Sequence, residues 1–526
     1  MQQKAVDSTA DKVVVIAGAG SGKTYLLIER LSKLKESGVD PESILVLTFT
    51  NVAAQEMSDR YKNRNKGAKT PRFGTFHSFC YSLILNDSLV RNAIGYSAPP
   101  SIATTEDIKR IKASARIVCG TKLSEKVLDT PLEKLQKVTD KIKFEYEVFQ
   151  KAYNKLLRKE NLITFDIMCY EVCRLFNENA ECIVKYKNQY RFIMVDEFQD
   201  TDPRQAEFMN SFTNSKLFVV GDFRQALYAF RGADSSIIKC LAENPKWETI
   251  VLSQNYRSTK EICEYANSIH NFSESSLNIN MTSDRDGDSV DVTYALNIQN
   301  DEELQAIAKE KTSDNKVAIL TRTNIEVDNI KTRLKALGIP YIDNASNNIM
   351  ADLLKCSIDS DYCIRYLANH LPQQEYMRYL KMTSTEPMNE ENFIICFGLN
   401  LRFMVAKIME IRKLMTDYPL VSLVFTELVN YLKLNIDVAE GLNCNNLTDV
   451  VNVLSEHLNT TSDTGLYVGT IHSSKGLEYD IVHVYGVNTK AFNPTKNEDE
   501  QNCYYVACTR AKSKLIIHDS NYGKEI

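Results

Sequence analysis

The chain lacks the features that mark several specialised classes of protein. Its 526 residues include only 12 prolines, 19 glycines and one tryptophan, and no low-complexity tract or fixed repeat is present. This composition excludes collagen-like and largely disordered chains. No apolar run approaches the roughly 20 residues that a membrane span needs. A targeting leader is also not expected, because a Gly-rich motif occupies residues 18–22.

Cysteine pairs and an excess of basic charge are also missing. The 13 cysteines are scattered, and no CxxC pair occurs. Cys169 and Cys173 lie one helical turn apart, but no second pair at zinc-ligand spacing accompanies them. We therefore expect ordinary thiols in a reducing cytoplasm. The formal net charge of −5 gives no global field that attracts nucleic acid, although a locally basic groove would be compatible with it.

Strand and helix patterns alternate over much of the chain, which predicts an α/β protein with parallel sheets. Residues 13–17, 44–49, 191–198, 216–223 and 248–254 read as strands of a first sheet, with a helix over 51–64. Residues 316–322, 466–471, 480–486 and 514–518 read as strands of a second sheet, with a helix over 324–338. Residues 81–190 and 346–464 read as mostly helical insertions. The length fits two to four domains.

One insertion carries a local excess of basic residues. The segment from Thr104 to Glu160 contains 14 lysines and arginines but only 9 aspartates and glutamates. Solvated helix faces explain such an excess, and so does a surface that flanks DNA. Both interpretations remain open at the level of the sequence.

The segment "VVVIAGAGSGKTYLL" (13–27) has the order strand, Gly-rich loop, helix. Gly20 and Gly22 allow backbone N–H groups to turn toward phosphate oxygens, Lys23 can reach the β- and γ-phosphates, and Thr24 can ligate Mg²⁺. Ala17 replaces the first glycine of the strict pattern. The predicted phosphate cradle consists of Ala17, Gly18, Ala19, Gly20, Ser21, Gly22, Lys23 and Thr24. By itself this loop does not distinguish kinases, GTPases, transporter subunits and motors.

An acid pair narrows the choice. "FIMVDEFQD" (192–200) is an apolar strand that ends in Asp196 and Glu197. Asp196 is suited to coordinate Mg²⁺, and Glu197 is suited to orient or deprotonate an attacking water. A surface acid pair is the alternative, but the upstream loop favours hydrolysis.

Further motifs follow in a fixed order: "LTFTNVAAQEM" (47–57), "GTFHSF" (74–79), "VVGDFRQALYAFRGAD" (219–234), "LSQNYRS" (252–258), "VGTIHSSKGLEYDIVHV" (468–484) and "YYVACTRAKSKLII" (504–517). Together they resemble the superfamily 1A DNA helicases of the UvrD/Rep/PcrA type. The resemblance spans residues 2–518. It implies two RecA-like P-loop domains, residues 1–80 with 191–253 and residues 254–345 with 465–526, each interrupted by a helical insertion.

The resemblance implies roles in nucleotide and DNA binding for individual residues. Gln2 would read adenine, Tyr256 would stack on it, and Glu478 would bind the ribose. Gln225 would sense the γ-phosphate, while Arg257 and Arg510 would act as arginine fingers whose forks suit the charge on the transferred phosphoryl group. The implied contacts to single-stranded DNA are Thr48, Phe49, Asn51, His77, Tyr228, Phe230, Arg231 and His472. For the aromatic pair at 228 and 230, core packing is the alternative.

The sequence departs from the repair helicases at identifiable places. Tyr25 stands where those proteins usually carry an arginine that stacks on adenine, so it would stack there or simply pack in its helix. Phe223 and Arg224 replace residues that are usually acidic. The second insertion is short, and the chain stops soon after residue 518. In size it is similar to the UvrD-like subunit of the Gabija anti-phage system, which works beside a separate nuclease protein.

Two functions fit the sequence. The first is an ATP- and Mg²⁺-dependent 3′→5′ single-strand DNA translocase and helicase, with the direction implied by the resemblance. The second is a regulatory subunit that senses ATP and DNA ends for a partner nuclease and unwinds little alone. DNA repair and antiviral defence are both compatible pathways. A P-loop kinase or GTPase would leave the other motifs unexplained.

Overall fold

A computed structural model provides the structure of the chain. It describes residues 1–103, 105–129, 138–229, 232–270, 279–294, 300–342, 347–371, 375, 378–379, 382, 388–418, 420–432, 444, 446–461 and 465–522. The chain divides into two compact units. The first comprises Met1–Gly74, Gln189–Cys363 and Phe403–Ile526, and the second comprises Thr75–Asn188 and Ile364–Arg402.

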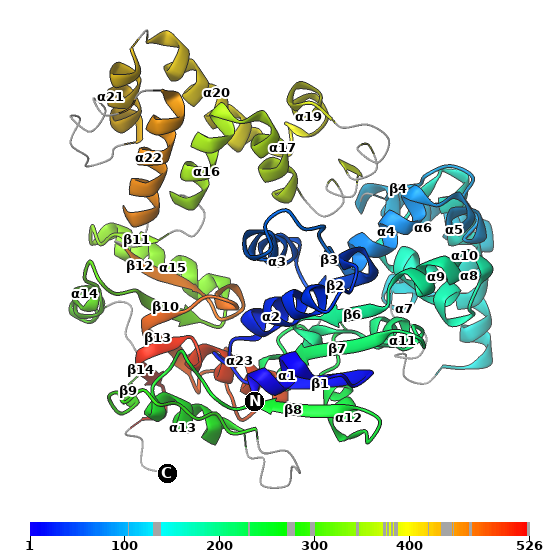
Figure 1. Cartoon of the computed structure of the whole chain (residues 1–526), viewed down its shortest axis with the longest axis horizontal. Helices are drawn as coiled ribbons and strands as arrows, with labels where there is room; N and C mark the ends of the chain where they lie inside the picture. Colours follow the sequence, from blue (N-terminus) through cyan, green and yellow to red (C-terminus); the bar gives the residue numbers. More distant parts are fainter. Residues whose placement is uncertain are drawn as a thin grey trace. The chain divides into compact units, whose positions relative to one another are not determined.

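A six-stranded sheet with the order β3-β2-β6-β7-β1-β8 lies in the first unit. Its strands are β1 (Lys12–Ala17), β2 (Ile44–Thr48), β3 (Arg72–Thr75), β6 (Phe192–Val195), β7 (Lys216–Gly221) and β8 (Glu248–Leu252). The paired strands β2, β6, β7, β1 and β8 run parallel. Figure 1 shows β1, from the start of the chain, between β7 and β8 from positions some 200 residues later.

The apolar strand sequences explain why this sheet is internal. Every residue of β2 is buried, as are all residues of β1 after Lys12. Strands buried on both faces are typical of parallel sheets covered by helices. Helix α2 (Lys23–Glu36) presents Leu26, Leu27 and Leu31 to this core.

A second six-stranded sheet has the order β11-β12-β10-β13-β14-β9, again with parallel pairs. Its strands are β9 (Asp291–Tyr294), β10 (Val317–Thr321), β11 (Tyr341–Ile342), β12 (Leu466–Thr470), β13 (Tyr479–Val487) and β14 (Ala511–Asp519). The two sheets confirm the predicted α/β class with two RecA-like cores.

The first unit also contains helices. They are α1 (Gln2–Asp7), α2, α3 (Asn51–Arg64), α11 (Pro203–Asn210), α12 (Ser236–Glu243), α13 (Lys260–Ile269), α14 (Asp301–Glu310), α15 (Asn324–Ala336), α16 (Asn347–Ile358), α20 (Arg402–Asp417), α21 (Val421–Leu432), α22 (Leu447–Thr461) and α23 (Glu498–Cys508). Short 3₁₀ turns occupy Pro41–Ser43, Phe198–Asp200, Phe223–Gln225 and His472–Ser474.

The second unit is mostly helical. It contains α4 (Phe76–Asn86), α5 (Ser88–Ala93), α6 (Thr105–Cys119), α7 (Glu125–Asp129), α8 (Asp140–Lys159), α9 (Phe165–Asn177), α10 (Glu181–Gln189) and α19 (Glu390–Phe397), while α17 (Ser360–Asn369) spans both units. A short pair of parallel strands, β4 (Ser101–Ile102) and β5 (Leu162–Ile163), joins two of its segments.

The predicted elements agree closely with the structure. The helix predicted over 51–64 is α3, and the strand predicted over 316–322 is β10. The sequence analysis did not predict β3, β9 or β11, which are short and have few buried residues, so their alternation is weak. The proposed four-domain boundaries remain a prediction.

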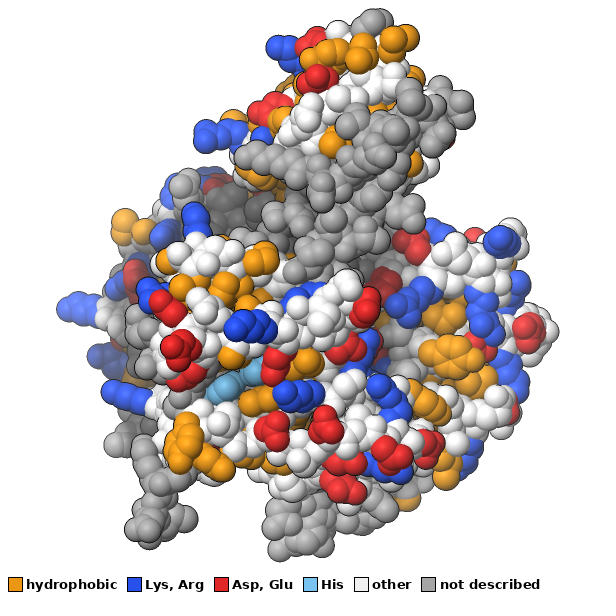
Figure 2. Space-filling model, turned by 90° about the vertical axis from the view of Figure 1, so that its left-hand side faces the viewer, with side chains coloured by type: hydrophobic (Ala, Val, Ile, Leu, Met, Phe, Trp, Pro, Cys, Tyr) orange, Lys and Arg blue, Asp and Glu red, His pale blue; other side chains and the backbone are white. Residues whose placement is uncertain are grey.

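Charges of both signs are interspersed on the face that Figure 2 shows, with apolar side chains between them. This distribution agrees with the small net charge of the chain. Within the described ranges, no helix combines the length and the apolar character that crossing a bilayer requires.

Candidate nucleotide site and aromatic platform

The Gly-rich loop connects β1 to α2 and turns through two left-handed glycines. Gly20 and Gly22 have φ angles of 67° and 81°. Side chains are strained at such angles, and space is also short. A Cβ on Gly20 would lie 2.8 Å from the Cβ of Arg257, and one on Gly22 would lie 2.9 Å from Nε2 of Gln2. Gln2 donates from that nitrogen to the carbonyl of Ser21 at 2.6 Å.

The loop that follows β8 is hydrogen-bonded to the Gly-rich loop. The side-chain amide of Asn255 donates to the carbonyl of Ala19 at 2.8 Å, and the backbone N–H of Tyr256 donates to the carbonyl of Gly20 at 3.0 Å. These bonds hold Tyr256 and Arg257 beside the phosphate loop.

The acid pair follows β6. Asp196 is 7% exposed, and its Oδ1 finds no hydrogen-bond partner among the described residues. Burial, together with the negative charge of Glu197, raises the pKa of Asp196. Glu197 adopts a left-handed conformation with φ 50° and ψ 44°. Such a conformation costs about 1–3 kcal/mol in a residue other than glycine, so the surrounding fold holds this carboxylate in place.

The pKa of Glu197 is lowered in spite of its surroundings. Burial opposes the charged form, but the positive charges of Lys23 and Lys475 and a hydrogen bond from Gln199 outweigh it. The carboxylate is therefore ionised at neutral pH, as a general base must be before it accepts a proton.

Lys475 reaches into this region from the 3₁₀ turn after β12. Its Nζ donates to Oδ2 of Asp200 at 2.5 Å and to the carbonyl of Gln225 at 3.2 Å, and it lies 4.0 Å from Oε2 of Glu197. The ammonium also lies 5.2 Å from the ring centroid of Tyr228. A single cation thus contacts the acidic loop, the Gln225 loop and an aromatic side chain.

The Gln225 loop follows β7 and faces Lys23. The Nζ of Lys23 lies 3.4 Å from Oε1 of Gln225, and Nε2 of Gln225 donates to Oδ2 of Asp222 at 3.0 Å. The two ends of the amide are therefore assigned to different partners, which fixes its orientation.

Two arginines approach from the part of the chain that contains the second sheet. Arg257 donates from Nε to Oε2 of Glu478 at 2.8 Å and from Nη1 to the carbonyl of Thr509 at 3.1 Å. Arg510 is 2% exposed and donates to the carbonyls of Val506 and Leu477 and to the hydroxyl of Thr509. None of these Arg510 partners is charged.

The surroundings of Arg510 favour an incoming anion. Burial and the nearby positive charge of Arg257 lower the pKa of Arg510 to about 9. A buried cation with neutral hydrogen-bond partners is stabilised when a negative group approaches.

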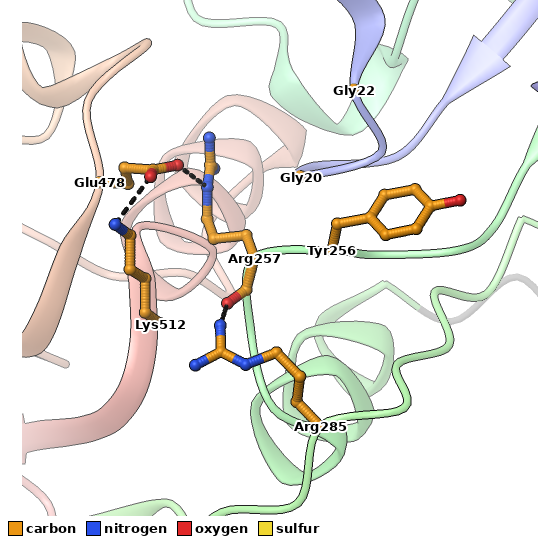
Figure 3. A pocket seen from close by; sticks show the side chains of 7 residues that line it. All are labelled: Gly20, Gly22, Tyr256, Arg257, Arg285, Glu478 and Lys512. Carbon is orange, nitrogen blue, oxygen red and sulfur yellow. Dashed lines mark hydrogen bonds and ion pairs between the residues drawn. The ribbon is translucent and has the colours of Figure 1, made fainter.

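A pocket of about 320 Å³ brings these segments together (Figure 3). It is lined by Gly20, Gly22, Tyr256, Arg257, Arg285, Glu478 and Lys512. Oxygens of Glu478 accept from Arg257 and from Lys512, each at 2.8 Å, and Arg285 donates to the backbone carbonyl of Arg257. Figure 3 shows the Tyr256 ring pointing away from this charged cluster. The pocket offers cations, a carboxylate and an aromatic face.

Two exposed tyrosines lie beside the Gly-rich loop, Tyr25 directly after it in sequence and Tyr256 through its backbone bond to Gly20. Tyr25, near the start of α2, is 57% exposed, and Tyr256 is 59% exposed. Each ring is therefore accessible to an additional aromatic group.

Part of the expected DNA-contact set forms a compact aromatic platform. Phe49, just after β2, stacks on Tyr228 with ring centroids 4.6 Å apart and planes 20° apart. Thr48 ends β2 and is buried, with its hydroxyl unpaired among the described residues, and Asn51 begins α3. Phe230 and Arg231 lie outside the described residues.

The two expected histidines belong to different units. His77 lies in α4 of the helical unit, where its ring meets Phe76 and Phe165 edge-on. His472 lies in the first unit after β12, and burial followed by the charge of Arg322 lowers its pKa.

Sequence reasoning missed Lys475, Arg285 and Lys512. Lys475 and Lys512 stand inside quoted motifs, within three residues of His472 and Arg510, so the motifs carried a signal for them. Their contacts are not visible in a string, however, because Lys475 and Asp200 are 275 residues apart. No motif pointed to Arg285.

The fold and the site define a P-loop protein with two RecA-like cores. Two family models match it: the UvrD/REP helicase N-terminal domain over residues 1–246, and the UvrD-like helicase C-terminal domain over residues 250–348 and 400–522. The chain therefore belongs to the superfamily 1A UvrD-like DNA helicases.

Named relatives align along nearly the whole chain. A probable DNA helicase II homolog of Mycoplasma capricolum is 28% identical, over 98% of this chain and 83% of the relative. The ATP-dependent DNA helicases PcrA of Staphylococcus aureus and Staphylococcus epidermidis are 26% and 27% identical, each over 98% of this chain and 82% of the relative.

Proposed function

We propose that the chain is an ATP-driven single-strand DNA translocase that moves 3′→5′ and unwinds duplex DNA, with ADP and phosphate as its products. The observation that carries the proposal is the pocket in which Gly20 and Gly22 of the phosphate loop meet Arg257 and Glu478 from the second core. A nucleotide bound there contacts both cores, so its hydrolysis changes how they are joined.

The residues divide the hydrolytic work. The loop N–H groups and Lys23 bind the phosphates, and Glu197, ionised and next to this site, accepts a proton from the attacking water. Arg257 and Arg510 stabilise the charge that develops on the transferred phosphoryl group. Because Glu478 accepts from Arg257 in the structure, a ribose that occupies Glu478 would free Arg257 for the phosphates.

The donor set also fits Mg²⁺. Asp196 has a buried oxygen with no partner among the described residues, and its raised pKa reflects the cost of leaving that carboxylate charged there. Thr24 and Asp196 would hold the ion. When bound, Mg²⁺ neutralises charge on the β- and γ-phosphates.

The bases of the DNA strand would stack on the platform of Phe49 and Tyr228. Aromatic faces bind bases of any identity at about 1–3 kcal/mol each. Lys475 contacts both the Tyr228 ring and the carbonyl of Gln225. A movement of Gln225 on loss of the γ-phosphate would therefore shift Lys475 and the Tyr228 ring. A motor needs such coupling between ATP hydrolysis and DNA binding. Tyr25 and Tyr256 would enclose the adenine.

The experiment is strand displacement by the purified chain on duplexes that carry a single-stranded tail at one end. We expect ATP-dependent unwinding from a 3′ tail and little from a 5′ tail. Glu197→Gln should bind ATP but lower turnover by about 10²–10⁴-fold, because the amide cannot accept the proton. Glu243→Gln, an exposed site on α12, is the matched control and should turn over normally.

Two outcomes would contradict parts of this proposal. Near-normal ATP turnover by Glu197→Gln on saturating single-stranded DNA would refute the catalytic assignment. DNA-stimulated hydrolysis without any unwinding would favour the regulatory alternative, in which a separate nuclease protein depends on this chain.

A further inference from the structure

Arg224 is a charged side chain in an unusual place. It precedes the sensor residue Gln225, and its side chain is 2% exposed. Buried charges need close partners. Nε of Arg224 donates to Oδ1 of Asp222 at 2.9 Å, and Nη2 donates to Oδ2 of Asp222 at 3.1 Å. Asp222 is fully buried, so the pair forms a two-pronged bond shielded from water.

The same guanidinium also contacts the part of the chain that belongs to the second core. Nη1 of Arg224 donates to the carbonyl of Ile279 at 3.0 Å. The guanidinium lies 4.8 Å from the ring centroid of Tyr505 in α23, and the hydroxyl of Tyr505 donates to Oδ2 of Asp222 at 3.3 Å. Arg224 therefore joins the loop after β7 to α23, the helix that ends two residues before Arg510.

Asp222 links Arg224 by hydrogen bonds to Gln225 and, through Gln199, to Glu197. It accepts from Nε2 of Gln225 at 3.0 Å, which leaves Oε1 of Gln225 to face Lys23. The backbone N–H of Asp222 donates to Oε1 of Gln199 at 3.0 Å, and Nε2 of Gln199 donates to Oε2 of Glu197 at 2.5 Å. A continuous chain of hydrogen bonds runs from Arg224 to both Gln225 and Glu197.

We propose that Arg224 is a positioning residue: through Asp222 it sets the orientation of Gln225, and through Tyr505 and Ile279 it ties that orientation to the helix that precedes Arg510. This inference rests on the proposed ATPase function and adds to it the residue that aligns the sensor with the finger. Arg224 is buried and bonds Asp222 and the Ile279 carbonyl, so we expect its influence to fall on turnover rather than on direct contact with ATP.

The test is the variant Arg224→Lys, which removes the forked guanidinium group but keeps the positive charge. In Arg224→Lys, one ammonium cannot bond both oxygens of Asp222 and reach the Ile279 carbonyl in the planar geometry of arginine. With saturating single-stranded DNA, we expect kcat for ATP to fall about 10- to 100-fold, as for other small misplacements of catalytic groups, and KM to stay within about threefold.

A double-mutant cycle distinguishes positioning from general support of the fold. If Arg224 acts through Gln225, Arg224→Lys lowers kcat in the wild-type background but not in a Gln225→Ala background. Tyr505→Phe, which keeps the ring and removes the hydroxyl that contacts Asp222 and Sδ of Met281, should show a smaller decrease with the same dependence on Gln225. This second variant keeps the inference testable if Arg224→Lys does not fold.

Arg91→Lys is the matched control, because Arg91 donates to the carbonyls of Ile84 and Leu85 in the helical unit. Its kcat should equal that of the wild type. The inference is overturned if Arg224→Lys keeps the wild-type kcat, or if the decreases of Arg224→Lys and Gln225→Ala multiply. A wild-type chain that does not hydrolyse ATP would instead refute the proposed function.

Discussion

At the scale of single residues, the site depends on charged side chains that are buried and therefore not solvated by water. Asp196, Asp222, Arg224 and Arg510 are each at most 7% exposed. Asp222 and Arg224 neutralise each other, whereas Arg510 has neutral partners and Asp196 has a free oxygen among the described residues. Arg510 and Oδ1 of Asp196 lack a hydrogen-bonded partner of opposite charge among the described residues, and a magnesium nucleotide would supply one to each.

Tyr25 provides a prediction at this scale. Its ring is exposed, and a stack on adenine would contribute to binding but not to the chemical step. We expect Tyr25→Ala to raise KM for ATP several-fold, in line with the ~0.5–1.5 kcal/mol of an aromatic pair, with kcat at saturating ATP largely intact. Steady-state ATPase measurements on saturating single-stranded DNA check this.

Tyr170→Ala removes an equally exposed tyrosine from α9 in the helical unit and is the control. An unchanged KM for Tyr25→Ala would mean that Tyr25 has no contact with the base.

The identities of the motif residues were readable from the sequence, but their contacts were not. The spacing of "DE" after an apolar strand indicates where Asp196 and Glu197 lie along the chain. It does not indicate that Glu197 adopts a left-handed backbone or that Lys475 reaches Asp200. Arg224 was visible only as a departure from the family pattern, because its partners Asp222, Ile279 and Tyr505 converge only in the folded chain.

At the scale of secondary-structure elements, the parallel sheet explains why distant motifs meet. β6, β7 and β1 are neighbours in the first sheet, and the acid pair, the sensor loop and the phosphate loop follow their carboxyl ends. The carboxyl ends of parallel strands share one edge, where ligands of α/β proteins bind. This convergence was predictable because these strands are apolar, largely buried and followed directly by their motifs. The short strands β3, β9 and β11 carry no comparable signal.

The second sheet carries a pH-sensitive contact between β13 and β14. His518 on β14 is 6% exposed, and its ring nitrogens contact Nδ1 of His483 and the carbonyl of Tyr294. Nε2 of His483 in turn contacts Glu310. Burial, with the adjacent His483, lowers the pKa of His518 from 6.5 to about 4. The unfolded chain therefore takes up a proton below pH 6.5 that the folded chain refuses until about pH 4.

We therefore expect acidification from pH 7 to pH 5 to destabilise the fold through His518 by about 2 kcal/mol. His518→Gln should remove that part of the pH dependence, whereas the exposed His370→Gln should retain it. The free energy of unfolding in urea at the two pH values measures the difference. Equal pH dependence in wild type and His518→Gln would contradict the assignment.

At the scale of the whole molecule, the account depends on two sheets that share one nucleotide. The order of the motifs predicted this division, since the phosphate loop and acid pair precede residue 250, and Arg510 and Glu478, the proposed finger and ribose contact, follow it. The structure brings Gly20, Tyr256, Arg257 and Glu478 to one pocket. Which side chains complete that pocket could not be predicted, because Arg285 and Lys512 contact it through the tertiary fold.

The most direct test of a shared site is ATP hydrolysis by Arg510→Ala. Arg510 lies in the second core, so it matters for chemistry only if both cores close on the same nucleotide. We expect DNA-stimulated turnover to fall by about 10³–10⁵-fold, the value of an arginine finger, with ATP still bound by the folded variant. Turnover by Arg510→Ala near the wild-type rate would contradict the account.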